Sequence, residues 1–122
     1  DTKHEDLMNL LEICEDYGID GYVATNTSNK REGLGYSKKE LSVIGRGGLS
    51  GRAIAKRSLE MTRWLSEGLS GGKPVISVGG IDSVNSALER LEAGAQLLQL
   101  YTALVYEGPG LVSDIAKACG RS

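Results

Sequence analysis

Three short apolar runs in this chain each stop abruptly at small or hydroxylated residues. The runs are GYVATNT at 21–27, VISVGGID at 75–82 and LLQLYTAL at 97–104. Their apolar positions are nearly continuous rather than alternating, which is typical of strands covered on both faces of a parallel sheet. The pattern predicts three buried parallel strands, at 21–26, 75–78 and 96–101.

Helical periodicity separates these strands. Helices are predicted at 4–17, at about 52–69, at 84–93 and after the EGPG turn at 107–110. Residues 28–49 show no clear period, and long irregular segments of this kind are usually functional or disordered. The order helix, strand, loop, helix, strand, helix, strand, turn, helix is typical of βα units around a parallel sheet. It predicts an α/β fold, a partial (βα)8 TIM barrel with about three C-terminal strands and their helices.

Length and composition narrow the possible classes of protein. At 122 residues the chain is expected to be one domain, 1–122, whereas a closed barrel of this kind takes about 250 residues. The net charge of −2 argues against a broad basic surface for nucleic acid. The two cysteines, Cys14 and Cys119, lack metal-ligand spacing, so no metal site is expected. No apolar run approaches the roughly 20 residues that span a bilayer.

Glycines follow the second predicted strand, where a ligand can meet the backbone. Gly79 and Gly80 end the strand at 75–78 and precede a helix that Asp82 or Ser83 can cap. Because glycine has no side chain, a phosphate can approach the N–H groups there, and the helix dipole adds a favourable field. The same glycines can instead form a simple tight turn, so phosphate binding is one of two interpretations of this pair.

Two further segments can add to such a site. Tyr101 and Thr102 follow the third strand, so the Thr102 hydroxyl and nearby N–H groups can complete a phosphate site, although Tyr101 can also simply pack at the rim. Ser50 and Gly51 precede the helix at 52–69, where Ser50 suits an N-cap and the same N–H groups can instead bind an anion. Because adjacent strand ends point to one place, these segments are expected to meet.

The polar triplet Thr25-Asn26-Thr27 follows the first strand. An asparagine amide offers a donor and an acceptor side by side, which matches a ring with adjacent C=O and N–H groups such as a pyrimidine. A turn-forming asparagine with flanking hydroxyls is the alternative. The only histidine, His4, has no evident acid–base partner. The residues therefore predict an anion-binding half-site without an evident catalytic base.

Four motifs, taken in order, resemble class 2 (quinone-dependent) dihydroorotate dehydrogenases: TNT at 25–27, GGLSGR at 47–52, VGGI at 78–81 and LYTALVYEGP at 100–109. The ordered set is specific, and the resemblance runs from about Tyr17 to the last helix. It implies the C-terminal half of a barrel that carries FMN, oxidises dihydroorotate to orotate in de novo pyrimidine (UMP) synthesis and passes electrons to a membrane quinone. Intact members are implied to be peripheral on the inner membrane, bacterial or mitochondrial, whereas this chain alone is expected to be soluble.

The resemblance also implies roles for residues of this chain. Thr25 would contact FMN, and Asn26 and Thr27 would bind dihydroorotate or orotate. The other implied FMN contacts are Ser50, Gly51, Gly79, Gly80, Tyr101 and Thr102.

The chain also departs from the family pattern. The catalytic serine base of the family, a flavin-contacting lysine and the quinone-binding helical element have no counterpart here. Ser28, Ser37 and Ser42 do not match the motif of the catalytic serine. No catalytic residue is therefore expected in this chain, and it is expected not to turn over dihydroorotate alone. The rival hypothesis is a non-catalytic half-barrel module that binds a phosphorylated ligand or self-associates through its open sheet edges.

Overall fold

The sheet is parallel, as the sequence predicts. A computed structural model of the chain describes residues 2–69 and 72–120. In these ranges β1 (Tyr22–Ala24), β2 (Val75–Val78) and β3 (Leu97–Gln99) form one sheet in the order β1-β2-β3. Tyr22 lies opposite Val75, and Ile76 lies opposite Leu97. All three strands therefore end at the same edge of the sheet.

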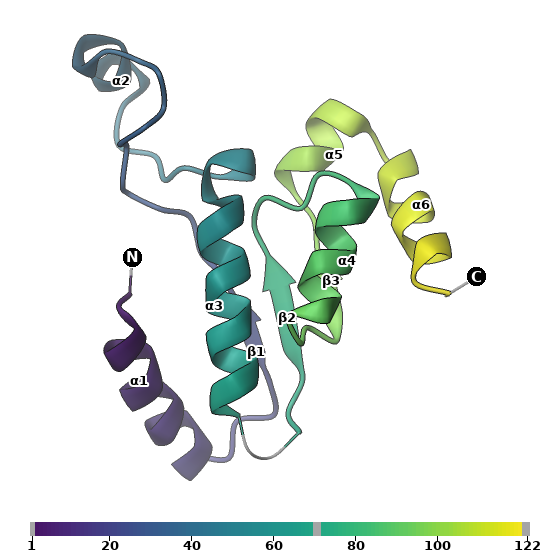
Figure 1. Cartoon of the computed structure of the whole chain (residues 1–122). Helices are drawn as coiled ribbons and strands as arrows, with labels where there is room; N and C mark the ends of the chain where they lie inside the picture. The colour runs from purple at the N-terminus through teal and green to yellow at the C-terminus, as the bar shows by residue number, and fades with distance from the viewer. Residues whose placement is uncertain (1, 70–71, 121–122) are drawn as a thin grey trace.

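Helices cover one side of this sheet (Figure 1). The helical segments are α1 (His4–Asp16), α2 (Lys38–Ile44), the 3₁₀ turn η1 (Gly51–Ile54), α3 (Ala55–Gly68), α4 (Val84–Glu92), α5 (Thr102–Glu107) and α6 (Gly110–Ala118). In Figure 1, α3 lies over β1 and β2 with α1 beside it, α4 lies over β3 with α6 outside it, and α2 projects away from the body. Within the described ranges, no helix combines the length and the apolar character needed to cross a bilayer.

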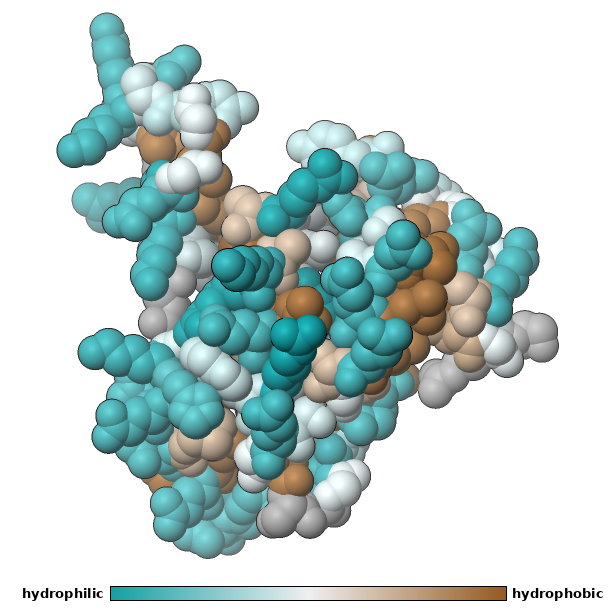
Figure 2. Space-filling view, viewed as in Figure 1, coloured by the Kyte–Doolittle hydropathy of each residue, from teal (hydrophilic) through white to brown (hydrophobic). Residues whose placement is uncertain are grey.

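Two hydrophobic clusters hold the helices to the sheet. The first joins α1, α3 and the sheet through buried side chains that include Leu7, Leu11, Leu65 and Val75. Leu7 and Leu11 are four residues apart, so they fall on the same helical face. The second joins α4 and α6 through Ile81, Ala87 and Ile115. Viewed from the helical side, the surface is mostly hydrophilic, with a hydrophobic strip beside α4 and α6 (Figure 2).

The expectation that both faces of the strands are covered is wrong for the described residues. Burial alternates along the sheet: Ala24 and Val75 are buried under the helices, whereas Val23 is 62% exposed and Leu97 is 44% exposed. Successive side chains of a strand point to opposite faces, so Val23 and Leu97 lie on the side that none of the described helices covers. In a closed barrel that side faces the interior, which layers of side chains fill.

The irregular segment 28–49 contains a helix that was not predicted. α2 begins at the N-cap Ser37, whose side chain accepts from the backbone N–H of Glu40 while the Glu40 carboxylate accepts from that of Ser37, a capping box. No residue of α2 is buried, which explains why its sequence lacks a helical hydrophobic period. At the base of the segment, Ser28 and Leu49 exchange backbone hydrogen bonds of 3.0 and 2.7 Å. The loop therefore leaves and re-enters the body at one point.

Two further element boundaries differ from prediction. The residues after the third strand form the short helix α5, because the run LLQLYTAL is too short for its period to distinguish a strand from a helix. The helix predicted from 52 begins as the 3₁₀ turn η1, and the Ser50 side chain makes no capping bond.

The cap of α4 is Ser83 rather than Asp82: its hydroxyl accepts from the N–H of Ser86.

A polar cluster fastens the opposite edge of the sheet, where β1 and β2 begin. The Tyr22 hydroxyl donates to Glu15 at 2.5 Å, and the Lys73 ammonium lies 3.0 Å from the same carboxylate oxygen. Burial, and then the hydrogen bond to Glu15, raise the pKa of Tyr22 from 10.0 to about 12. The hydrogen bonds from Tyr22 and Lys73 lower the pKa of Glu15.

These shifts predict two pH limits of stability. Tyrosine ionises near pH 10.0 in the unfolded chain but near 12 in the folded one, so the stability from this group is full below pH 10.0 and is lost as pH rises towards 12. The Glu15 contribution is present above its ordinary pKa of 4.5 and is lost as pH falls below that value. We expect the urea unfolding midpoint of Tyr22→Phe to fall less between pH 10 and 12 than that of the wild-type chain. An unchanged alkaline limb in this variant would show that another group causes it.

Candidate functional site

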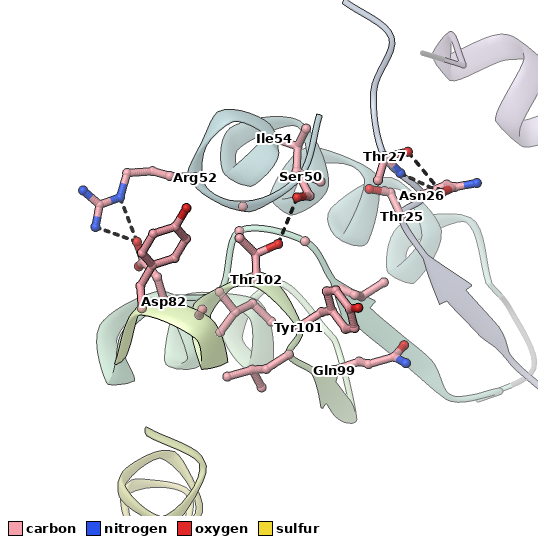
Figure 3. Close-up of a pocket in the computed structure, with 18 of the residues that line it drawn as sticks. Thr25, Asn26, Thr27, Ser50, Arg52, Ile54, Asp82, Gln99, Tyr101 and Thr102 are labelled. Carbon is pink, nitrogen blue, oxygen red and sulfur yellow. Dashed lines mark hydrogen bonds and ion pairs between the residues drawn. The ribbon is translucent and has the colours of Figure 1, made fainter. Parts of the chain in front are cut away.

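The carboxyl ends of the three strands open into one pocket of about 690 Å³. Its lining comes from the segments after β1, before α3, after β2 and after β3, so parts of the chain far apart in sequence meet here (Figure 3). The residues predicted as site residues all line it: Thr25, Asn26, Thr27, Ser50, Gly51, Gly79, Gly80, Tyr101 and Thr102. A volume in this range suits a small-molecule ligand.

The glycine pair after β2 brings bare backbone to the pocket wall. Gly79 and Gly80 have φ of +109° and +74°, a region that favours glycine. A Cβ on Gly80 would lie 2.5 Å from the Cα of Ala55, so the two backbone segments touch. Within the described part of the chain, the N–H groups of Gly80 and Ile81 donate to no protein acceptor. These donors lie two and three residues before Ser83, the N-cap of α4, on the side of the helix N-terminus, where the helix dipole favours an anion.

The segment before α3 meets the segment after β3 directly. The Thr102 hydroxyl donates to the Ser50 hydroxyl at 3.0 Å (Figure 3). A Cβ on Gly51 would lie 2.9 Å from the methyl carbon of Thr102, so this glycine allows the close approach. Tyr101 is 82% exposed and is not packed at a rim, which corrects that alternative. The pair of hydroxyls places further hydrogen-bonding groups beside the free N–H groups of the β2–α4 loop.

The polar triplet after β1 forms the other end of the pocket. The Thr25 N–H donates to the Val78 carbonyl at 2.9 Å, which fastens the triplet to the end of β2. The Asn26 Oδ1 accepts from the Thr27 N–H at 2.8 Å and from the Thr27 hydroxyl at 3.5 Å, so the amide NH₂ is the end left for a ligand. In Figure 3 the Asn26 side chain extends away from Ser50 and Thr102. A ligand that contacts both ends must therefore be elongated.

Thr27 is fastened by the long loop. A Cβ on Gly48 would lie 2.1 Å from Thr27 Oγ1, so only glycine fits there. The Arg31 guanidinium donates to the Leu41 carbonyl at 3.0 Å and to the Gly47 carbonyl at 2.6 Å. These bonds hold the loop that carries Gly48, which in turn fixes the place of Thr27.

Sequence reasoning missed two arginines of this region. Arg52, at the start of the helix predicted from 52, forms an ion pair with Asp82 at 2.8 Å across the pocket rim, although its side chain is 84% exposed (Figure 3). Arg90 is 2% exposed and donates to the Gly79 carbonyl from behind the pocket wall. Arg90 lies three residues after the buried Ala87, on the same face of α4. The sequence does not show that a charged side chain is buried there, because the groups that accept its hydrogen bonds lie on other elements.

The donor set suits a phosphate better than a cation. Among the described residues, no group of three or more histidine, cysteine, aspartate or glutamate side chains could hold a metal ion. The end of the pocket near Gly79 and Gly80 instead offers N–H groups, hydroxyls and space that side chains would fill at Gly79, Gly80 and Gly51. We call the N–H groups of Gly80 and Ile81, with the hydroxyls of Ser50 and Thr102, the phosphate cradle.

Comparisons with known proteins all identify the same family. The family model described as Dihydroorotate dehydrogenase matches residues 1–121. A protein named dihydroorotate dehydrogenase (quinone) from Christiangramia forsetii is 48% identical over 116 residues, which cover 94% of this chain and 33% of that protein. One of the same name from Arthrobacter sp. is 44% identical over 109 residues, 89% of this chain and 30% of that protein. The chain thus spans about a third of the length of these curated relatives.

Solved structures agree on the fold. A crystal structure of ligand-free DHODH from Eimeria tenella superposes with a TM-score of 0.83 at 26% identity, covering 98% of this chain and 32% of that one. The complex of that DHODH with ferulenol gives a TM-score of 0.84 at 28% identity, covering 98% and 31%. The parallel sheet with its helices is therefore part of a TIM barrel, as the sequence predicts.

Proposed function

The chain belongs to the dihydroorotate dehydrogenase family, and we propose that it supplies the phosphate end of the FMN site and part of the dihydroorotate site of a quinone-dependent enzyme. One observation carries the proposal: three strand ends meet in a single pocket, with free N–H groups at one end and an asparagine amide at the other. FMN has a matching shape, with a phosphate at one end and a ring at the other.

The phosphate cradle is the part of the chain best suited to FMN. The N–H groups of Gly80 and Ile81 would donate to phosphate oxygens, with the dipole of α4 adding a favourable field. The Ser50 hydroxyl, which accepts from the Thr102 hydroxyl, would donate its own proton to the phosphate, and Thr102 would orient it. Gly51, Gly79 and Tyr101 complete the wall, and Thr25 lies towards the ring end. When bound, FMN supplies the hydride acceptor for the oxidation of dihydroorotate.

The substrate contacts assigned to this chain are Asn26 and Thr27. Because the Asn26 oxygen is engaged by the Thr27 N–H, the amide NH₂ would donate to a carbonyl or carboxylate oxygen of dihydroorotate or orotate. The Thr27 hydroxyl adds a second polar group beside it. Both side chains would orient the pyrimidine rather than move a proton.

The first test compares FMN with riboflavin, which lacks the phosphate. We expect FMN to bind the chain at least about tenfold more tightly, since charge-assisted hydrogen bonds are the strong ones in such a cradle. Flavin fluorescence titrations with the two ligands measure this preference, and AMP as competitor reports on phosphate binding without a flavin ring. Equal affinity for FMN and riboflavin would contradict the assignment of the phosphate.

A second candidate function is a non-catalytic half-barrel module that binds some other phosphorylated ligand or self-associates. The exposed side of the sheet, with Val23 and Leu97, supports it. The same titration separates the two functions. The module would bind AMP as tightly as FMN, whereas the flavin site would prefer FMN.

A further inference from the structure

Arg90 is a buried cation at the back of the pocket wall. Its side chain is 2% exposed and donates four hydrogen bonds. They go to the hydroxyls of Ser58 and Ser77 at 2.6 and 3.4 Å and to the carbonyls of Ala55 and Gly79 at 2.7 and 3.0 Å. The guanidinium thereby joins α4 to the beginning of α3 and to the glycine turn after β2.

No carboxylate neutralises this charge within the described residues. Every acceptor of Arg90 is a neutral hydroxyl or carbonyl, and its Nε has no partner. Burial lowers the pKa of the guanidinium, while the charge of the adjacent Glu89 opposes that shift. A buried charge without a counter-charge is unfavourable, so an anion bound nearby would relieve part of that penalty.

The contact with Gly79 fixes which way the next amide points. Within the described residues, the cis peptide bond recorded is Ala24–Thr25, so the bond between Gly79 and Gly80 is trans. In a trans peptide the C=O and the following N–H point to opposite sides. Since Arg90 draws the Gly79 carbonyl inward, the Gly80 N–H points away from Arg90. Gly80 lines the pocket, and its N–H has no acceptor among residues 2–69 and 72–120.

We propose that Arg90 is a positioning residue for the phosphate cradle: it holds the Gly79–Gly80 peptide with the Gly80 N–H towards the ligand, and its buried charge favours the bound phosphate across that peptide. The proposal rests on the proposed FMN function and adds a residue that does not itself line the pocket. A purely structural role for Arg90 would stabilise the fold without affecting the preference for a phosphate.

The test measures the ratio of FMN to riboflavin affinity in the whole chain. We expect Arg90→Met to lower FMN affinity about tenfold while riboflavin affinity changes less than about twofold, because only the phosphate uses the oriented N–H and the charge. Arg90→Lys keeps the charge but replaces the planar guanidinium with a compact ammonium whose three donors share one nitrogen, so it should retain part of the preference. Leu65→Ala, in the hydrophobic cluster that joins α1, α3 and the sheet, is the control for lost stability without a change at the cradle.

The outcomes separate this inference from the proposed function. If the wild-type chain shows no preference for FMN, both fail. If wild type prefers FMN and Arg90→Met keeps the wild-type ratio, the positioning role alone fails. Arg90→Leu, which likewise removes the charge and every donor, replaces Arg90→Met if that variant does not fold, and an unchanged ratio there overturns the inference equally. A fall in both affinities by the same factor also overturns it, since that is the signature of a structural role.

Discussion

Gly80→Ala should lower the free energy of unfolding by about 3 kcal/mol and FMN affinity by about 100-fold. The new Cβ would lie 2.5 Å from the Cα of Ala55, a backbone atom that cannot rotate away. The backbone φ of +74° adds strain of about 1–2 kcal/mol for any L side chain, and overpacking adds typically about 1–3 kcal/mol. Relief of the clash would move the Gly80 N–H out of the cradle. Urea unfolding and flavin titration measure the two losses.

Gly18→Ala is the matched control for this prediction. Gly18 also has a positive φ, +70°, but a Cβ there would meet nothing within 4 Å. It follows α1, outside the pocket lining, so its replacement should introduce strain alone and leave FMN affinity unchanged. If Gly80→Ala lowered FMN affinity no more than Gly18→Ala does, the close approach of the β2–α4 loop to α3 would not be needed for binding.

The chain loaded with FMN should be reduced by dihydroorotate at least about 100-fold more slowly than a full-length relative under the same conditions. A positioned acid or base contributes typically about 10²–10⁴-fold, and the family resemblance assigns the serine base to no residue of this chain. Asp82, a carboxylate of the pocket, is paired with Arg52 at the rim. Anaerobic stopped-flow absorbance of the flavin measures the rate.

The full-length protein of Christiangramia forsetii is a suitable reference, since it is 48% identical to the chain over 116 residues. The comparison uses FMN-saturated samples, so a low rate cannot arise from an empty site. Reduction of the chain's flavin within about tenfold of the reference rate would contradict the view that its residues bind and orient without moving the proton.

The sheet could be predicted because the hydropathy of its residues reflects their burial. Val75–Val78 is an apolar run that ends at two glycines, so both the strand and the turn after it are visible in the sequence. Since parallel strands end at one edge, the meeting of the three polar segments followed from the order of elements alone. The family resemblance then gave the separate residues their predicted roles.

Other features depend on partners that a local pattern does not reveal. Arg90 is buried because Ser58 and Ser77, from different elements, accept its hydrogen bonds, and neither is near it in sequence. α2 contacts no core, so only its capping box marks it. We expected the Asn26 amide to offer a donor and an acceptor to a ligand, but its oxygen accepts from the Thr27 N–H. This contact depends on the backbone turn, which composition does not predict.

The central claim, that the neighbouring strand ends bind the phosphate of FMN, is tested most directly by backbone amide NMR of the isotope-labelled chain during titration with FMN and, separately, riboflavin. The N–H resonances of Gly80, Ile81 and Thr102 should shift with FMN and saturate together, while riboflavin leaves them in place. Shifts confined to the other edge of the sheet, around Tyr22 and Lys73, would contradict the claim.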